Sequence, residues 1–129
     1  MPPERKRFDI EQGAEWIRRV RVVDVDLTGY TWKLEIRGKF ASTTTAAGED
    51  PVIVLSSGQI THMTLQSGST VRDVIRIVMP STSSVLLQNQ DNDQTQPQYV
   101  GTLFGRPSGG DWRAYLHCDF YITPRATVV

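Results

Sequence analysis

The sequence has little that could cross-link the chain covalently. Its 129 residues include a single cysteine, Cys118. One cysteine excludes an internal disulfide and any zinc or iron–sulfur site built from several cysteines. A chain of this length buries enough apolar surface to fold without such links, because the buried fraction of the surface rises with chain length. We therefore expect one domain with its own hydrophobic core.

The sequence also lacks a net charge. Fourteen Lys and Arg residues balance fourteen Asp and Glu residues. Non-specific binding of nucleic acid depends on neutralising many phosphates, and binding to an anionic membrane depends on clustered basic residues. We therefore expect neither nucleic acid nor membrane as a partner. A net charge near zero removes self-repulsion and favours association, which suits an assembled subunit.

Long apolar runs are missing as well. The longest apolar-rich stretch, Val74–Met79, is far shorter than the ~20 residues that span a bilayer. Residues 1–7 carry a basic cluster without the apolar segment of a secretory signal. We expect a soluble protein that is made in the cytoplasm.

Motifs for catalysis and cofactor binding are not found. The sequence has no phosphate-binding glycine motif and no serine nucleophile elbow. His117 and Cys118 are neighbours on an expected strand, so their side chains point to opposite faces and cannot form a catalytic dyad. His117 and Asp119 share a face, but two ligands do not make a metal site unless His62 joins from another strand. We expect a non-enzymatic protein without cofactor or metal, with Cys118 as a small buried residue.

The composition favours β-structure. Val, Ile and Thr number 13, 8 and 13. These β-branched residues pack well on pleated sheets, while glycines and prolines interrupt the chain at short intervals. The pattern predicts seven or eight short strands in a two-sheet sandwich or a barrel.

Two strands have strict alternation of apolar and other residues, which predicts one buried face each. They are Tyr30–Arg37, with Tyr30, Trp32, Leu34 and Ile36 inward, and Trp112–Thr123, with Leu116, Cys118, Phe120 and Ile122 inward.

The remaining segments give weaker signals. Glu15–Val25 alternates imperfectly, which predicts a bent strand, an edge strand or one that lies against another subunit. Ser81–Leu87 is a single helical turn or a short connection. Ala41–Pro51 and Gln88–Gln98 are long polar loops. Further strands are predicted at Val52–Leu55, Ile60–Leu65, Val71–Met79 and Tyr99–Phe104. We divide the chain into an N-terminal arm, residues 1–13, and a single β domain, residues 14–129.

Basic residues gather near the N-terminus. Residues 1–21 contain six Lys and Arg and four Asp and Glu. The two clusters could contact nucleic acid, with Trp16 or Trp32 as stacking platforms. Arginine also suits protein interfaces, and this interpretation fits the neutral chain better. A mildly basic arm can pair with the next copy of the chain. The clusters are Arg5-Lys6-Arg7 and Arg18-Arg19-Arg21.

The order of short motifs resembles a group of small virion proteins and fibre-proximal domains of tailed bacteriophages. Its members carry an I-x-Q-G start, a D-L-T-G turn before a strand, and a closing strand that ends in V-T. The matching segments here are Phe8–Ala14, Val25–Thr31, Trp32–Arg37, Ile77–Pro80 and Thr123–Thr127. Each motif is mostly turn chemistry, so the order over nearly the whole chain carries the resemblance.

The resemblance implies a two-sheet antiparallel β-sandwich, immunoglobulin-like or jelly-roll, inside the phage particle. The sequence departs from the group because no fibre shaft or receptor-binding domain follows the sandwich. This departure favours an adaptor or decoration subunit that docks on a symmetric head or tail assembly. Its expected partners are other virion proteins and copies of itself, as a homotrimer or a higher symmetric assembly.

The residues expected at this interface come from both basic clusters, the arm and one long loop. An alternative function is a carbohydrate-binding module of a tail fibre or baseplate, in which Trp112, Tyr115 and Tyr121 stack on sugars. The candidate interface residues are Arg5, Arg7, Phe8, Ile10, Arg18, Arg19, Arg21, Gln94 and Gln96.

Overall fold

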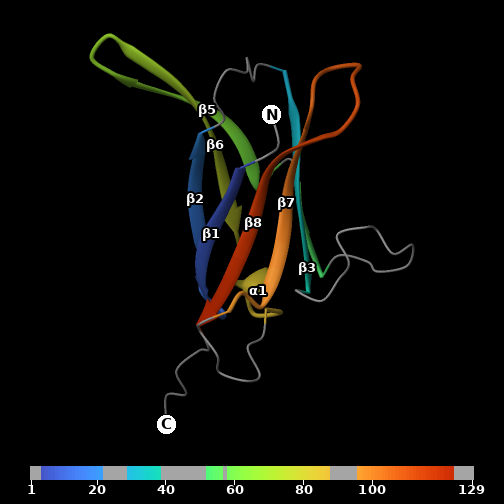
Figure 1. Cartoon of the computed structure of the whole chain (residues 1–129). Coiled ribbons are helices and arrows are strands. Elements are labelled where there is room, and N and C mark those ends of the chain that lie inside the picture. The colour runs from blue at the N-terminus through green and yellow to red at the C-terminus, as the bar shows by residue number, and fades with distance from the viewer. Residues whose placement is uncertain (1–3, 22–28, 39–51, 57, 88–95, 124–129) are drawn as a thin grey trace.

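Two β-sheets packed face to face form the protein (Figure 1), as seen in a computed structural model that describes residues 4–21, 29–38, 52–56, 58–87 and 96–123. One sheet has the strand order β1-β8-β7-β3-β4 and the other the order β2-β6-β5. The all-β sandwich predicted from the sequence is confirmed. The elements are β1 (Glu4–Glu11), β2 (Trp16–Arg21), β3 (Thr31–Gly38), β4 (Ile53–Leu55), β5 (Ile60–Ser67), β6 (Thr70–Met79), α1 (Ser81–Ser84), β7 (Tyr99–Arg106) and β8 (Arg113–Thr123).

The connectivity is that of the immunoglobulin-like alternative. In that fold, strands B, D and E form one sheet and strands C, F and G form the other. Here β2, β5 and β6 take the first set of places, and β3, β7 and β8 take the second. Trp32 lies on β3, where immunoglobulin domains carry a buried tryptophan. The inter-sheet disulfide of antibody domains has no counterpart, because Cys118 is the sole cysteine.

The N-terminal segment is part of the large sheet, which corrects the predicted arm. β1 pairs with β8 in parallel, from Glu4 opposite Leu116 to Glu11 opposite Thr123. The sandwich is therefore not wholly antiparallel, and the boundary drawn at residue 13 cuts through one fold unit. Phe8 and Ile10 alternate with charged residues in the period of two expected of a half-buried strand.

The predicted buried faces of β3 and β8 are confirmed. Trp32, Leu34 and Ile36 are buried on β3, as are Leu116, Cys118, Phe120 and Ile122 on β8. Tyr30 packs against the same core and is half-buried.

The two sheets meet through aromatic rings along the side formed by β1 and β2. Trp16 of β2 lies edge-on to Phe8 of β1, with ring centroids 5.1 Å apart, and edge-on to Phe120 of β8 at 6.1 Å. Phe8 and Phe120 stack at 5.8 Å. Edge-to-face and offset-stacked pairs are the favoured aromatic geometries, so this cluster fixes the N-terminal strand to both sheets.

A β-bulge near the start of β8 changes the direction of one side chain. The register of β7 and β8 shifts between Leu103 and Phe104, and the extra residue on β8 is Tyr115. Its ring packs against Trp32 and Tyr30, with centroids 5.5 and 6.1 Å away. Strict alternation had placed Tyr115 on the outer face, and the bulge corrects this.

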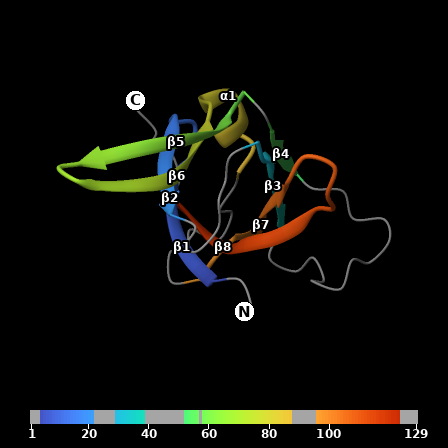
Figure 2. The same cartoon turned by 90° about the horizontal axis from the view of Figure 1, so that it is seen from above.

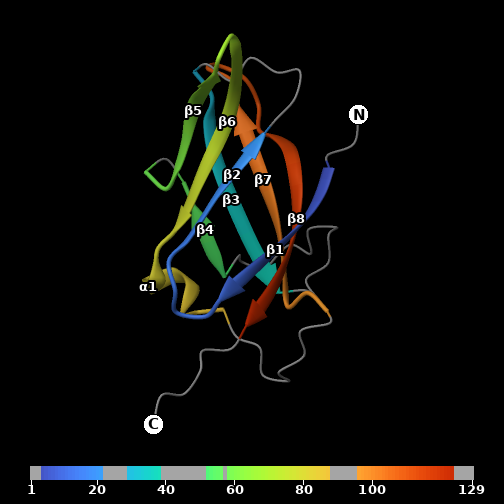
Figure 3. The same cartoon turned by 90° about the vertical axis from the view of Figure 1, so that its left-hand side faces the viewer.

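Two hairpins extend beyond the packed sheets at the end opposite α1 (Figure 1), and the β5–β6 hairpin also projects sideways (Figure 2). β2 pairs with β6 as far as Val74, while β5 and β6 continue pairing to Ser67 opposite Thr70. The three-stranded sheet lies in front of the larger one in Figure 3. β2 pairs with β6 alone, which confirms the predicted edge strand.

At the other end, α1 confirms the predicted helical turn within Ser81–Leu87. Ser84 is buried, and its hydroxyl donates to the carbonyl of Ala14 at 2.7 Å, which ties α1 to the β1–β2 turn. The predicted loop at Ala41–Pro51 and most of the loop at Gln88–Gln98 lie outside the described residues.

Candidate interaction surface

Two of the predicted interface residues belong to the core. Phe8 is 8% exposed and Ile10 is 1% exposed. Both face the small sheet from β1, so neither is available to a partner chain. The prediction was wrong here because the many charges of the segment indicate an exposed arm, whereas its two alternating apolar residues belong to a sheet edge.

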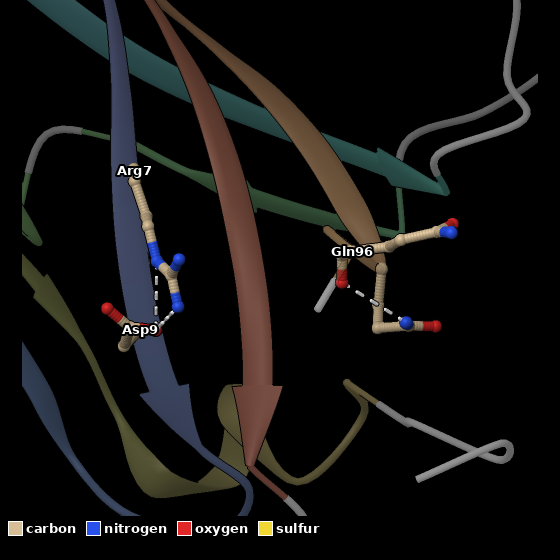
Figure 4. A network of polar contacts seen from close by, with 4 residues as sticks. Arg7, Asp9 and Gln96 are labelled. Carbon is tan, nitrogen blue, oxygen red and sulfur yellow. Dashed lines mark hydrogen bonds and ion pairs between the residues drawn. The ribbon is translucent and has the colours of Figure 1, made fainter. Parts of the chain in front are cut away.

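Arg5 and Arg7 are engaged within the chain. The Arg5 guanidinium pairs with the Asp119 carboxylate on β8 at 2.5 Å. Arg7 pairs with Asp9 at 3.0 Å (Figure 4), and its guanidinium lies 3.8 Å from the centroid of the Tyr121 ring. The hydrogen bond with Asp9 raises the pKa of Arg7. The contacts with Asp119 and Tyr121 tie β1 to β8, while both arginine side chains remain 58% exposed.

Alternation along β2 places Arg18 on the same inner face as the buried Trp16 and Val20, yet its side chain is exposed. Its guanidinium donates to the carbonyl of Ile17 at 2.9 Å and lies 5.5 Å from the centroid of the Trp16 ring. β2 is an edge strand, so a long side chain can leave the interior around that edge. Arg18 therefore covers Trp16 and reaches solvent.

The remaining predicted arginines, Arg19 and Arg21, are exposed on the outer face of β2. The register of β2 and β6 places Arg76 directly opposite Arg19. We call Arg19, Arg21 and Arg76 the arginine face. None of the three forms an ion pair with another described residue. The small sheet carries this face on the side away from the core, toward the viewer in Figure 3.

Apolar side chains lie beside the arginine face. Ile17 is 36% exposed, and Val78, opposite it in the register, is half-buried. The only carboxylate of β2, β5 and β6 belongs to Asp73, which alternates to the other face of the sheet and pairs with His62 at 3.0 Å. Thr64 also donates to that carboxylate, at 3.4 Å. The outer face of the three strands thus carries cations and apolar groups without an acid.

Arg76 was missed in the sequence because it stands alone in the apolar stretch Val74–Met79. Its neighbours in the chain give no signal of a basic surface. A predicted register between β2 and β6 would have revealed it, since residues opposite one another in adjacent strands share a face.

The two loop residues predicted at the interface add little to the candidate interaction surface. Gln94 lies outside the described residues. Gln96 is exposed just before β7, and its carbonyl accepts a hydrogen bond from the Gln98 side chain at 3.3 Å (Figure 4). Gln96 is not near the arginine face in the topology, because β7 belongs to the other sheet.

The reactive side chains are separated. His62 is on β5 in the small sheet, and His117 is on β8 in the large one. His117 is half-buried, and its Nδ1 lies 3.3 Å from the Thr102 hydroxyl. Burial raises the pKa of the Cys118 thiol to about 12, which keeps it protonated. Within the described ranges, His, Cys, Asp and Glu do not gather in threes that could hold a metal ion.

The three aromatic residues considered for sugar binding have different surroundings. Tyr115 packs against Trp32, and burial raises the pKa of its hydroxyl. Tyr121 is covered by Arg7. Trp112 is half-buried, with Lys33 Nζ 4.6 Å and the Arg106 guanidinium 4.8 Å from its ring centroid.

A comparison with protein-family models and with curated proteins finds no match to this chain. Among the residues that the structure describes, no helix has the length and apolar character needed to span a bilayer.

Proposed function

We propose that this chain is a non-enzymatic structural subunit of a bacteriophage virion, an adaptor or decoration subunit that docks on a symmetric head or tail assembly. The observation that carries the proposal is the order of short motifs along nearly the whole chain. The first motif has a defined structural use in this fold. Gly13 has a φ of 81° in the turn after β1, where the chain passes from the large sheet to the small one.

The surface also supports a docking role. The arginine face presents a residue type that is enriched at protein interfaces, and it lies beside the apolar side chains of Ile17 and Val78. The partners in this proposal are other virion proteins and further copies of the chain, arranged as a trimer or a larger symmetric ring. Such a subunit works by shape and contact, and its location is the particle.

The test is quantitative mass spectrometry of purified particles of the encoding phage. The chain is expected in mature particles in a copy number that is a multiple of the symmetry of one head or tail ring. Detection only in lysates of infected cells, and not in particles, would overturn the proposal.

A carbohydrate-binding module is the second candidate, and Trp112 favours it. The indole ring is partly exposed between two cations, a setting that suits an acidic sugar. A glycan array probed with the wild-type chain and with Trp112→Ala tests this. Binding that the variant loses supports the module, and an array without binding excludes the glycans displayed.

A further inference from the structure

The arginine face places like charges side by side. Arg19 and Arg76 are cross-strand partners, and Arg21 is two residues further along the same face. Like charges directly opposite in a sheet destabilise it. None of the described acids forms an ion pair with these three arginines. A bound anionic group would remove the repulsion.

We infer that the arginine face is the docking surface for a carboxylate-bearing surface of another protein of the particle. This inference rests on the proposed function and names the partner's chemistry. A guanidinium presents donors in a fixed fork that matches a carboxylate. Ile17 and Val78, next to the arginines, add the apolar contact that a protein partner uses at the centre of an interface.

Nucleic acid and lipid fit this surface less well. Three cations neutralise few phosphates, and the chain as a whole has no net charge. A second copy of the chain fits less well too, because its described acids are either paired within the chain or dispersed: Glu4 and Glu11 lie at opposite ends of β1, Glu15 precedes β2 and Asp111 precedes β8. Asp9 pairs with Arg7, Asp119 with Arg5, and Glu35 with Lys33 and Arg37. The described residues therefore offer no compact acidic surface on a second copy.

Charge reversal on the face tests the inference. The variants are Arg19→Glu, Arg76→Glu and the double variant. The matched control is Arg113→Glu, which makes the same change on an exposed arginine of the other sheet. Either single reversal creates a Glu–Arg pair across β2 and β6, so its urea midpoint is expected to stay equal or rise. A loss of binding in such a variant therefore cannot come from unfolding.

The first measurement uses a soluble probe and needs no particle. Poly-L-glutamate is titrated onto the wild-type chain and each variant, at low and at high salt. We expect each reversal to weaken binding by about tenfold or more, the Arg113→Glu control to bind like wild type, and salt to weaken all binding. Equal binding by the double variant would overturn the inference. Tighter wild-type binding to heparin or to phosphatidylglycerol vesicles than to poly-L-glutamate would also overturn it.

The second measurement separates the inference from the proposed function. Purified wild-type and variant chains are added to particles that lack the chain, and bound copies are counted by mass spectrometry. Rebinding by wild type and control, but not by either single reversal, supports both statements. Rebinding by wild type, control and all variants refutes the inference about the arginine face but leaves the proposed structural role standing. If the wild-type chain does not rebind and is also missing from native particles, the structural role fails, whatever the poly-L-glutamate result.

Discussion

Two glycines on β7 occupy positions where a side chain has no room. A Cβ atom at Gly105 would lie 2.6 Å from the Trp32 ring, and one at Gly101 would lie 2.7 Å from the Phe120 ring. Neither ring can move away without disturbing other packed side chains, because both rings are buried in the core. The close approach of backbone and ring lets β7 support two aromatic side chains from its neighbouring strands.

Alanine at either glycine is expected to lower the free energy of unfolding by about 1–3 kcal/mol, the usual cost of overpacking a core. Gly38→Ala is the control, since a Cβ atom there meets nothing within 4 Å. Its effect should stay within about 0.5 kcal/mol. Urea titrations followed by tryptophan fluorescence measure all three variants. Similar midpoints for Gly105→Ala and Gly38→Ala would contradict the packing of Trp32 on β7.

Cys118 predicts a specific dependence of stability on alkaline pH. Burial raises the pKa of its thiol from the ordinary 9.0 to about 12. Below pH 9 the thiol is protonated in the folded and the unfolded chain, so it adds no pH dependence. Between about pH 9 and 12 only the unfolded thiol ionises, so the free energy of unfolding falls by up to about 1.4 kcal/mol per pH unit.

Cys118→Ala removes this contribution. The variant should be less stable than wild type at pH 8, because it leaves a cavity, yet lose stability more slowly as the pH rises above 9. Urea titrations at pH 8, 9.5 and 10.5 give the two slopes. Identical slopes for the two proteins would show that the thiol is not buried as described.

At the scale of elements, β1 is the strand whose role differs most from expectation. Its charged residues face solvent or pair with β8, while Phe8 and Ile10 complete the core. An exposed arm and an integral strand predict different consequences of mutation. Loss of the Phe8 ring removes contacts with Trp16 and Phe120. The isolated chain should therefore lose stability even without a partner.

Phe8→Ala is expected to cost about 3–5 kcal/mol of stability, as for other buried phenylalanines. Lys6→Ala, on the same strand and exposed, should change stability by no more than about 0.5 kcal/mol. Thermal and urea unfolding of the purified chain compare the two. If Phe8→Ala kept wild-type stability and impaired only assembly, the segment would be an arm after all.

The strands that could be predicted from the sequence have a clear alternation of apolar and polar residues. β3 and β8 alternate over most of their length, so their buried faces follow from the sequence. β1 has only two apolar residues among its charges, and its place depends on parallel pairing with the far end of the chain. The direction of Tyr115 depends on a bulge, and the position of Arg76 on a register between strands. Such relations are set by tertiary packing, which local sequence does not encode.

At the scale of the molecule, the zero net charge is unevenly distributed. The described residues include twelve Lys and Arg but eight Asp and Glu, against fourteen of each in the whole chain. Among the described residues, basic side chains therefore outnumber acidic ones. The acids that restore neutrality are Asp24, Asp26, Glu49, Asp50, Asp91 and Asp93, all outside the described residues.

The parallel pairing of β1 with β8 also determines how the molecule responds to mechanical tension. Glu4 begins β1 and Thr123 ends β8, so the two points lie at opposite ends of one pair of adjacent strands. A pull on both points slides the strands along each other, and the eight paired positions resist together. An antiparallel pair pulled from one end would instead open one hydrogen bond at a time. A subunit held at both ends of its chain would therefore resist tension in shear, its strongest direction.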